Sequence, residues 1–142
     1  MKTLERTEEK KSSMKKEMEK LNSIRTLGDL KASGYKYRSI SDELRENLIT
    51  ALKSRKNIFE GIWGYEDTVI PDIERAILSG HNINLLGLRG QAKTRIARLM
   101  VGLLDPFIPV IAGSEINDDP LFPLSFTGRQ MVGELGDETP VS

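Results

Sequence analysis

One short run of residues has the types and spacing needed to bind phosphate. The run is Gly87, Leu88, Arg89, Gly90, Gln91, Ala92, Lys93 and Thr94. Glycines allow the backbone to turn tightly, so that its N–H groups can close around phosphate oxygens. The ammonium of Lys93 would bridge the outer phosphates, and the Thr94 hydroxyl would coordinate Mg²⁺. The pattern predicts a phosphate-binding loop for ATP and Mg²⁺, with Lys93 as catalytic residue and Thr94 as metal ligand.

The segments on either side of this loop have the periodicities of a strand and a helix. A short apolar run precedes the loop and suits a buried strand of a parallel sheet. After Thr94 the apolar residues recur at i, i+3, i+4, i+7 and i+8, which predicts a helix with one face on that sheet. The helix N-terminus would bring about half a positive charge to the phosphates. Strand, loop and helix in this order predict an α/β fold of parallel strands with flanking helices. The apolar residues are Ile83, Leu85, Leu86 and Leu88, then Ile96, Leu99, Met100, Leu103 and Leu104.

The loop departs from the full pattern at Ala92, where glycine is expected before the lysine. Alanine is harmless if this residue has negative φ, and damaging if the backbone must pass within contact of a phosphate. Arg89 could contact phosphate. Arg95 directly follows the loop and is a candidate nucleotide-binding residue, although solvent exposure or a structural ion pair is the plainer interpretation of Arg95 and Arg98. The competing interpretation of the whole segment is an ordinary strand, turn and helix with a surface lysine.

The composition excludes several classes of site. The 142 residues include no cysteine and one histidine, so disulfides, thiolate metal sites and histidine-rich metal sites are excluded. Basic and acidic residues number 21 each, so no net charge attracts nucleic acid or an anionic membrane. No apolar run approaches the ~20 residues that cross a bilayer, and the Lys/Glu-rich N-terminus lacks the apolar segment of a signal peptide. We expect a cytoplasmic protein with no membrane and no clear nucleic-acid partner.

Three segments are expected along the chain. Residues 1–22 are predicted to be a charged, helical or disordered arm, because they offer almost no apolar face for burial. A docking function for this arm stays open, since three apolar residues there share one helical face. Residues 23–57 are predicted to form a helical lead-in, and residues 58–142 an incomplete nucleotide-binding core. The three apolar residues are Met14, Met18 and Leu21.

Two helices are predicted ahead of the loop. The first runs from about residue 42 to 57, with Ser41 or Asp42 as its N-cap. The second runs from about 68 to 78 and ends at Ser79 and Gly80, because glycine suits the residue that follows a helix.

Three stretches together resemble the AAA+ ATPases, and within them the branch of the magnesium chelatase ATPase subunit and the MoxR-type ATPases. Ile62-Trp63-Gly64-Tyr65-Glu66-Asp67 resembles the I-V-G-Q motif whose backbone borders the adenine. Gly87 to Thr94 resembles the Walker A loop, with Ala92 as a departure. Pro109 to Pro120 resembles the second core strand and the Asn/Asp-Pro turn that follows it. These stretches span about residues 58–125.

The resemblance implies a function and its cofactors. Tyr65 would lie beside the adenine, while Lys93 and Thr94 would serve the phosphates and Mg²⁺. The full-length family member would form a homo-oligomeric ring that hydrolyses ATP to remodel a protein client or to assist metal insertion. The chain lacks a hydrophobic-Asp-Glu strand, the sensor residues and the arginine finger of the family. We therefore expect the N-terminal portion of such an ATPase, inactive by itself.

Other interpretations of particular residues stay open. Four oxygen-bearing side chains within five positions suggest a metal site, although an acidic loop that ends in an Asp-Pro turn explains them more simply. A different class of function is a non-catalytic interaction module with a vestigial loop. A third is a fragment of an enhancer-binding transcriptional activator, because Ser125-Phe126-Thr127-Gly128 partly matches the Phe-Thr-Gly loop of that class. The four oxygen-bearing residues are Glu115, Asn117, Asp118 and Asp119.

Overall fold

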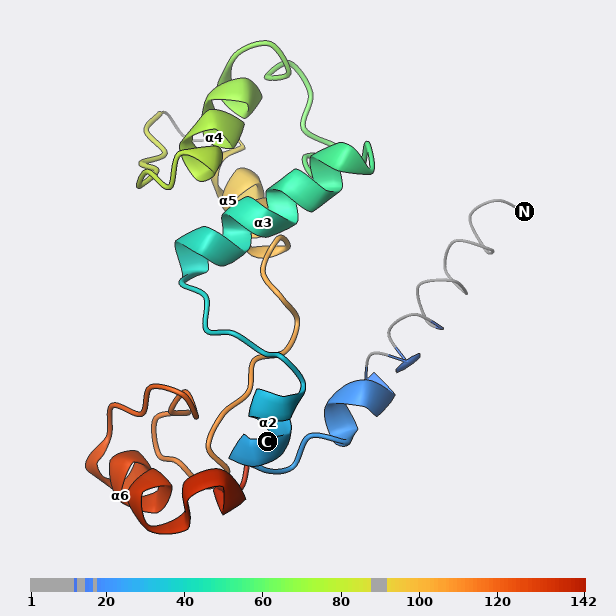
Figure 1. Cartoon of the computed structure of the whole chain (residues 1–142). Coiled ribbons are helices and arrows are strands. Elements are labelled where there is room, and N and C mark those ends of the chain that lie inside the picture. The colour runs from blue at the N-terminus through green and yellow to red at the C-terminus, as the bar shows by residue number, and fades with distance from the viewer. Residues whose placement is uncertain (1–11, 13–14, 17, 88–91) are drawn as a thin grey trace. The chain divides into compact units, whose positions relative to one another are not determined.

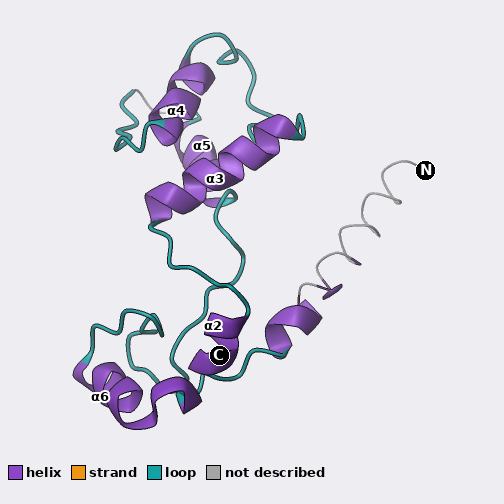
Figure 2. Ribbon diagram, in the orientation of Figure 1, coloured by secondary structure: helices purple, strands orange, loops and turns teal. Residues whose placement is uncertain are grey.

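The computed structural model describes residues 12, 15–16, 18–87 and 92–142. These residues form helices joined by turns and extended segments (Figures 1 and 2). The chain divides into a central unit, Arg38–Phe107, and a terminal unit, Met1–Tyr37 with Ile108–Ser142. These boundaries are not those of the three segments expected from the sequence, whose functional division stays a prediction. The elements are α2 Leu27–Ala32, α3 Ile40–Lys53, α4 Val69–Leu78, α5 Lys93–Val101, α6 Phe126–Leu135 and the 3₁₀ helix η1 Gly136–Glu138.

Three helices of the central unit, α3, α4 and α5, surround one apolar core. Ile96 contributes from α5 and is 2% exposed, so this helix is anchored by a side chain three residues beyond Lys93. Burial of such side chains contributes roughly 1.5–3 kcal/mol each. The core residues are Leu48, Phe59, Ile62, Ile73, Ile77, Ile96 and Leu103.

The predicted helices are present, with corrections at both ends of α3, which runs from Ile40 to Lys53 rather than from about 42 to 57. Its N-cap is Ser39, whose backbone is extended and whose hydroxyl accepts a hydrogen bond from the Asp42 N–H at 3.2 Å. The predicted caps Ser41 and Asp42 lie inside the helix. The helix starts at Ile40, so Ser39 is the residue in the N-cap position. A capping side chain accepts a hydrogen bond from the backbone N–H two or three residues after it, which here is that of Asp42.

The ends of α3 and α4 share one hydrogen-bond pattern with different residues. After α4, Gly80 has φ 69° and the N–H of His81 donates to the Ala76 carbonyl at 2.9 Å. The predicted end of this helix at Ser79 and Gly80 is therefore confirmed. After α3, Arg55 takes the left-handed place with φ 53°, and the Lys56 N–H donates to the Ala51 carbonyl at 2.9 Å. A non-glycine residue in this conformation costs about 1 kcal/mol.

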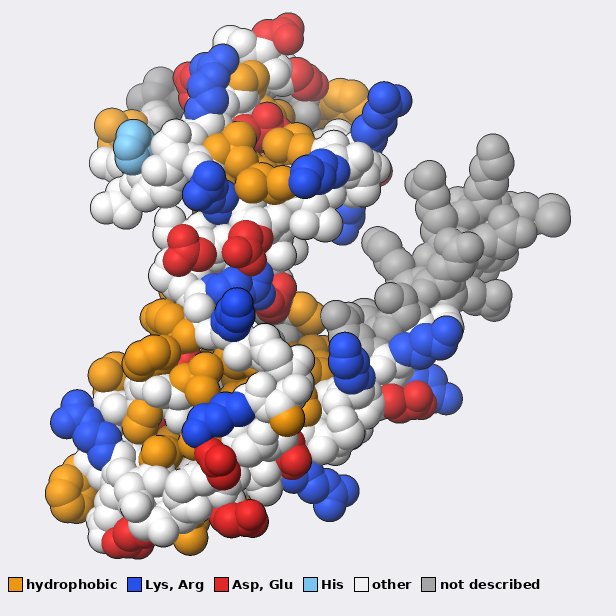
Figure 3. Space-filling model, in the orientation of Figure 1, with side chains coloured by type: hydrophobic (Ala, Val, Ile, Leu, Met, Phe, Trp, Pro, Cys, Tyr) orange, Lys and Arg blue, Asp and Glu red, His pale blue; other side chains and the backbone are white. Residues whose placement is uncertain are grey.

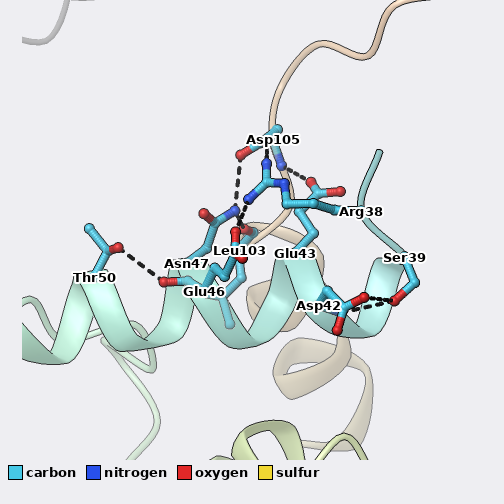
Figure 4. Close-up of polar contacts among 9 residues, drawn as sticks. All are labelled: Arg38, Ser39, Asp42, Glu43, Glu46, Asn47, Thr50, Leu103 and Asp105. Atoms are coloured by element: carbon cyan, nitrogen blue, oxygen red, sulfur yellow. Dashed lines mark hydrogen bonds and ion pairs between the residues drawn. The ribbon is translucent and has the colours of Figure 1, made fainter. Parts of the chain in front are cut away.

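A polar network fixes the end of α5 on α3 (Figure 4). Arg38 bridges Glu46, at 2.7 Å, and Asp105. Asn47 donates to the Leu103 carbonyl at 2.6 Å and to Asp105 at 3.0 Å. The hydrogen bond to Glu46 raises the pKa of Arg38, and the charges of Asp105, Glu46 and Glu43 act in the same direction. The helix predicted within the lead-in thus packs in the same unit as α5.

The terminal unit is held by antiparallel backbone pairing and a small core. Val110 and Ser142 exchange both backbone hydrogen bonds, at 3.0 and 2.9 Å, and Val141 donates to the Arg25 carbonyl at 2.8 Å. Leu27 and Leu30 of α2 pack with Val141. The Thr26 hydroxyl and the Asp29 carboxylate form a capping box at the start of α2. The hydrogen bonds that this carboxylate accepts from Arg25 and Thr26 lower the pKa of Asp29.

The two segments predicted to be parallel strands, residues 82–87 and the stretch that contains Ile111, do not pair with each other among the described residues. Among the described residues 82–87 no strand is assigned; Ile83 and Leu85 pack on the core, whereas Leu86 is 83% exposed. Ile111 belongs to the terminal unit, where it forms an isolated antiparallel bridge with Val141 of the same unit. The helices are present, but the parallel sheet is not formed among the described residues, and the P-loop α/β fold stays a prediction. Within the same part of the chain, no helix combines the length and apolar character needed to cross a membrane.

Candidate phosphate-binding site

The structure describes both ends of the predicted phosphate-binding loop. Gly87 at its start has φ 151°, a backbone conformation that favours glycine. At its other end α5 begins at Lys93, so the helix starts at the lysine as the motif requires. Leu88, Arg89, Gly90 and Gln91 lie outside the described residues, and their predicted contacts with phosphate stay predictions.

The Lys93 side chain reaches from one end of the loop to the other. Its ammonium donates a hydrogen bond to the Gly87 carbonyl, and the residue is half-buried. Among the described residues, no carboxylate forms an ion pair with Lys93. The charge is therefore held beside the loop by a neutral acceptor, which an anion could replace.

Ala92, the one departure from the loop pattern, lies in the left-handed region with φ 56° and ψ 10°. Its carbonyl accepts from the Ile96 N–H at 2.9 Å and so begins the α5 ladder. An L residue in this conformation costs about 1–2 kcal/mol, and glycine adopts it freely. The alternative of negative φ, in which alanine would be harmless, does not hold. The departure therefore carries a conformational cost even before any ligand is considered.

The N-terminus of α5 is not capped by a side chain. The helix has no acidic residue in its first turn, and Thr94 and Arg95 are exposed. The first backbone N–H groups of a helix have no intrahelical acceptors, and their dipoles favour an anion. By contrast, α2, α3 and α6 each begin with a Ser or Thr side chain that accepts from the backbone, and α4 has Asp72 in its first turn.

The turn that contains Tyr65 shares its core with the start of α5. Tyr65 and Ala92 are both partly buried against the cluster that includes Ile96. The Arg95 guanidinium lies so close to Gly61, where φ is 80°, that a Cβ there would collide with it. The structure thus brings Tyr65 into the same unit as Ala92, Lys93, Thr94 and Arg95. Contact of Tyr65 with adenine, and of Arg95 with nucleotide, stays a prediction.

The acidic stretch 115–119 contains a carboxylate that is used inside the protein. Asp118 is 3% exposed and accepts hydrogen bonds from the Ser125 and Ser114 hydroxyls and from the N–H groups of Leu124 and Ser125. The Ser125 hydroxyl is the largest of the causes that hold the pKa of Asp118 well below its usual range. No group of three or more His, Cys, Asp or Glu side chains that could hold a metal ion occurs among the described residues. The simpler interpretation as an acidic turn accounts for Asp118 completely.

The Ser-Phe-Thr-Gly match has a structural explanation in the same place. Ser125 is the N-cap of α6 and its hydroxyl accepts from the Gly128 N–H at 2.9 Å. A Cβ on Gly128 would lie 2.6 Å from the Asp118 carboxylate. Sequence reasoning missed this pairing of Asp118 with the start of α6. A serine followed by helix-compatible residues was the available signal for the cap.

Comparison of the chain with protein-family models, with curated proteins and with solved structures found no match. The interpretation of the loop therefore depends on its residues and on the geometry around Lys93.

Proposed function

We propose that this chain is the ATP-binding portion of a chelatase/MoxR-like AAA+ ATPase. The observation that supports this most is the start of α5, where uncapped backbone N–H groups lie beside an ammonium that has no carboxylate partner among the described residues. An anion is the ligand that such a helix start favours. The order of loop, lysine and threonine selects the phosphates of a nucleotide.

Binding would proceed by exchange of acceptors at Lys93. In the free protein its ammonium donates to the Gly87 carbonyl, a neutral oxygen. A phosphate oxygen carries charge and forms a shorter, stronger hydrogen bond with the same donor. Thr94 is exposed beside Lys93, so its hydroxyl could complete the coordination of a Mg²⁺ ion that accompanies the nucleotide. ATP and Mg²⁺ are the proposed cofactors.

Hydrolysis requires more than this loop. A second acidic motif must polarise water, and an arginine from a neighbouring subunit must stabilise the transferred phosphoryl group. We propose that the full-length protein supplies these groups within a homo-oligomeric ring, which couples hydrolysis to remodelling of a partner protein or to metal insertion. The 142-residue chain is expected to bind nucleotide without turning it over.

The test is a titration of the chain with a fluorescent ATP analogue in the presence of Mg²⁺. Lys93→Ala is expected to weaken binding more than tenfold, because hydrogen bonds to charged groups contribute roughly 1.5–3 kcal/mol. Lys53→Ala is the matched control, since Lys53 is an exposed lysine at the end of α3 in the same unit. Equal affinities of the Lys93→Ala and Lys53→Ala proteins would reject the proposal.

A non-catalytic interaction module is the second candidate, and the conformation of Ala92 favours it. A methyl group at a left-handed position next to Lys93 adds strain in a place where glycine is expected. Under this alternative the loop would have lost nucleotide affinity. Saturable ATP binding that requires Lys93 would exclude it, and ATP turnover by this chain would exclude it more strongly.

A further inference from the structure

A groove lies in the central unit between α3 and α5. Its volume is about 500 Å³, within the range of cavities that hold small molecules. Its walls are the second half of α3, the turn that follows it, and the second half of α5. The lining residues are Asn47, Thr50, Ala51, Ser54, Lys56, Asn57, Ile58, Arg98, Leu99, Gly102 and Leu103.

The charge of the groove is of one sign. The lining includes two cations, Lys56 and Arg98, and no Asp or Glu. The whole chain has equal numbers of acidic and basic residues, 21 each, and Figure 3 shows side chains of both kinds at the surface, so this local excess differs from the average surface. Neither cation forms an ion pair with any described residue. An anionic group would give both side chains a partner.

The walls of the groove are held by internal hydrogen bonds. Asn47 ties α3 to the Leu103 carbonyl at 2.6 Å, and Figure 4 shows this contact beside Thr50. The Lys56 N–H donates to the Ala51 carbonyl at 2.9 Å, and the Asn57 carboxamide oxygen accepts from the Phe59 N–H at 3.1 Å. The backbone that carries Lys56 is therefore fixed, and a ligand would lose little free energy in ordering it.

The most buried residues that line the groove are apolar. Ala51 and Leu103 are 8% and 7% exposed, and Leu99 is half-buried. Gly102 adds no side chain at the end of α5, where a Cβ would meet only the backbone of its own helix. Such a surface suits a hydrocarbon body, and the two cations belong to the same lining.

We propose that this groove binds a small amphipathic anion, a compound with an aliphatic or aromatic body and one carboxylate. The body would cover Ala51, Leu99 and Leu103, and the carboxylate would lie between Lys56 and Arg98. The lining includes neither Lys93 nor Thr94, and its residues on α5, from Arg98 to Gly102, follow Lys93 by five to nine positions, roughly 7 to 13 Å along a helix. The proposal therefore does not depend on nucleotide binding.

The test is an NMR titration of the ¹⁵N-labelled chain with octanoate. The expected result is a saturable shift of the amides of Ala51, Leu99 and Gly102. Lys56→Gln and Arg98→Gln should each weaken the affinity about fivefold, the upper range for exposed ion pairs. Arg45→Gln is the matched control on α3, because Arg45 is exposed and does not line the groove. Lys93→Ala should leave octanoate binding unchanged.

Two further ligands separate the parts of the proposal. Inorganic phosphate should cause less than a tenth of the octanoate shift at equal concentration, because it has no apolar body. Octanol has the apolar body without the charge. Its affinity for the wild type should therefore be about as low as the affinity of octanoate for the double variant Lys56→Gln, Arg98→Gln. Equal binding of octanol and octanoate, or no saturable shift at these amides, overturns the proposal.

Discussion

Two helix N-termini in this protein meet the same electrostatic requirement in opposite ways. At α6 the protein supplies its own anion: Asp118 accepts from the Leu124 and Ser125 N–H groups at 2.7 and 2.9 Å, beside the Ser125 cap. At α5 the N-cap is Ala92, the first turn has no acidic residue, and the Lys93 ammonium donates to the Gly87 carbonyl. The first helix start is complete within the protein, whereas the second has positive charge and no internal anion among the described residues.

The difference explains why similar-looking sequence features deserve different interpretations. Ser125-Phe126-Thr127-Gly128 and the residues around Lys93 each partly match a loop motif of a known ATPase class. Ser125 and Gly128 are accounted for by packing and capping within the terminal unit. Lys93 is paired only with a neutral carbonyl among the described residues. A functional interpretation is therefore better supported for Lys93 than for Ser125.

The largest structural effect is expected for removal of the internal anion at α6. Asp118→Ala leaves two backbone N–H groups and two hydroxyls without their acceptor, and unsatisfied buried donors are costly. We expect the Tm of the chain to fall by roughly 10 °C and α6 to lose protection from hydrogen exchange. Glu115→Ala, at an exposed residue of the same loop, should leave both quantities unchanged. Equal Tm values for the two variants would contradict the role of Asp118.

The free energy of unfolding should depend on pH through the protonation of the Asp118 carboxylate. The folded-state pKa of Asp118 lies below its unfolded value, first because of the Ser125 hydroxyl. Its contribution is therefore fully present above about pH 4 and is lost as pH falls through lower values. Urea midpoints measured at about pH 5 and about pH 3 should fall more steeply for the wild type than for Asp118→Asn, which has no carboxyl to protonate. Parallel losses in the two proteins would show that Asp118 is not responsible.

Gly128 should be intolerant of a methyl group that Gly133 accepts. A Cβ at Gly128 lies 2.6 Å from an Asp118 oxygen that hydrogen bonds hold in place, whereas nothing lies within 4 Å of a Cβ at Gly133. Gly128→Ala should lower the Tm by roughly 5 °C. Gly133→Ala, in the same helix, should raise the free energy of unfolding by about 0.5–1 kcal/mol through helix propensity. The opposite signs separate a local clash from a general effect of alanine on α6.

At the start of α5 the smallest change is expected from relief of backbone strain. Ala92→Gly should raise the free energy of unfolding by about 1 kcal/mol, since glycine adopts φ 56° without cost. Ala97→Gly, at an exposed position inside the same helix, should lower it by about 1 kcal/mol. Urea unfolding measures both. A loss of stability in Ala92→Gly would show that Ala92 does not occupy the left-handed region in solution.

Local features of the fold were predictable from the sequence, and features that need distant partners were not. The end of α4 at Gly80 and the start of a helix at Lys93 depend on neighbouring residues and were predicted correctly, whereas α5 ends at Val101, before the apolar residues Leu103 and Leu104 that were predicted to belong to it. The N-cap of α3 was misplaced by two or three residues, because Ser39, Ser41 and Asp42 all have capping side chains. The contact of Asp118 with Ser125 joins residues across a turn, and no periodicity predicts it. The parallel sheet stays a prediction because strand pairing depends on partners that residues 82–87 do not find within the described residues.

The candidate site divides in the same way. The order of Gly87, Lys93 and Thr94 in the sequence was enough to predict that a helix starts at the lysine. The left-handed conformation of Ala92 could not be predicted, because the sequence allowed either sign of φ. The groove between α3 and α5 was also missed, since Lys56 and Arg98 lie far apart in the sequence and neither belongs to a motif.

The most direct test of the central claim is a ¹⁵N NMR titration of the chain with ATP and Mg²⁺ that compares the two helix starts. The amides of Lys93, Thr94 and Arg95 should shift in a saturable manner, while those of Phe126, Thr127 and Gly128 should stay in place. Lys93→Ala should abolish the shifts at α5. Shifts of equal size at both helices, or none at α5 at saturating nucleotide, would contradict the assignment of α5 as the phosphate-binding helix.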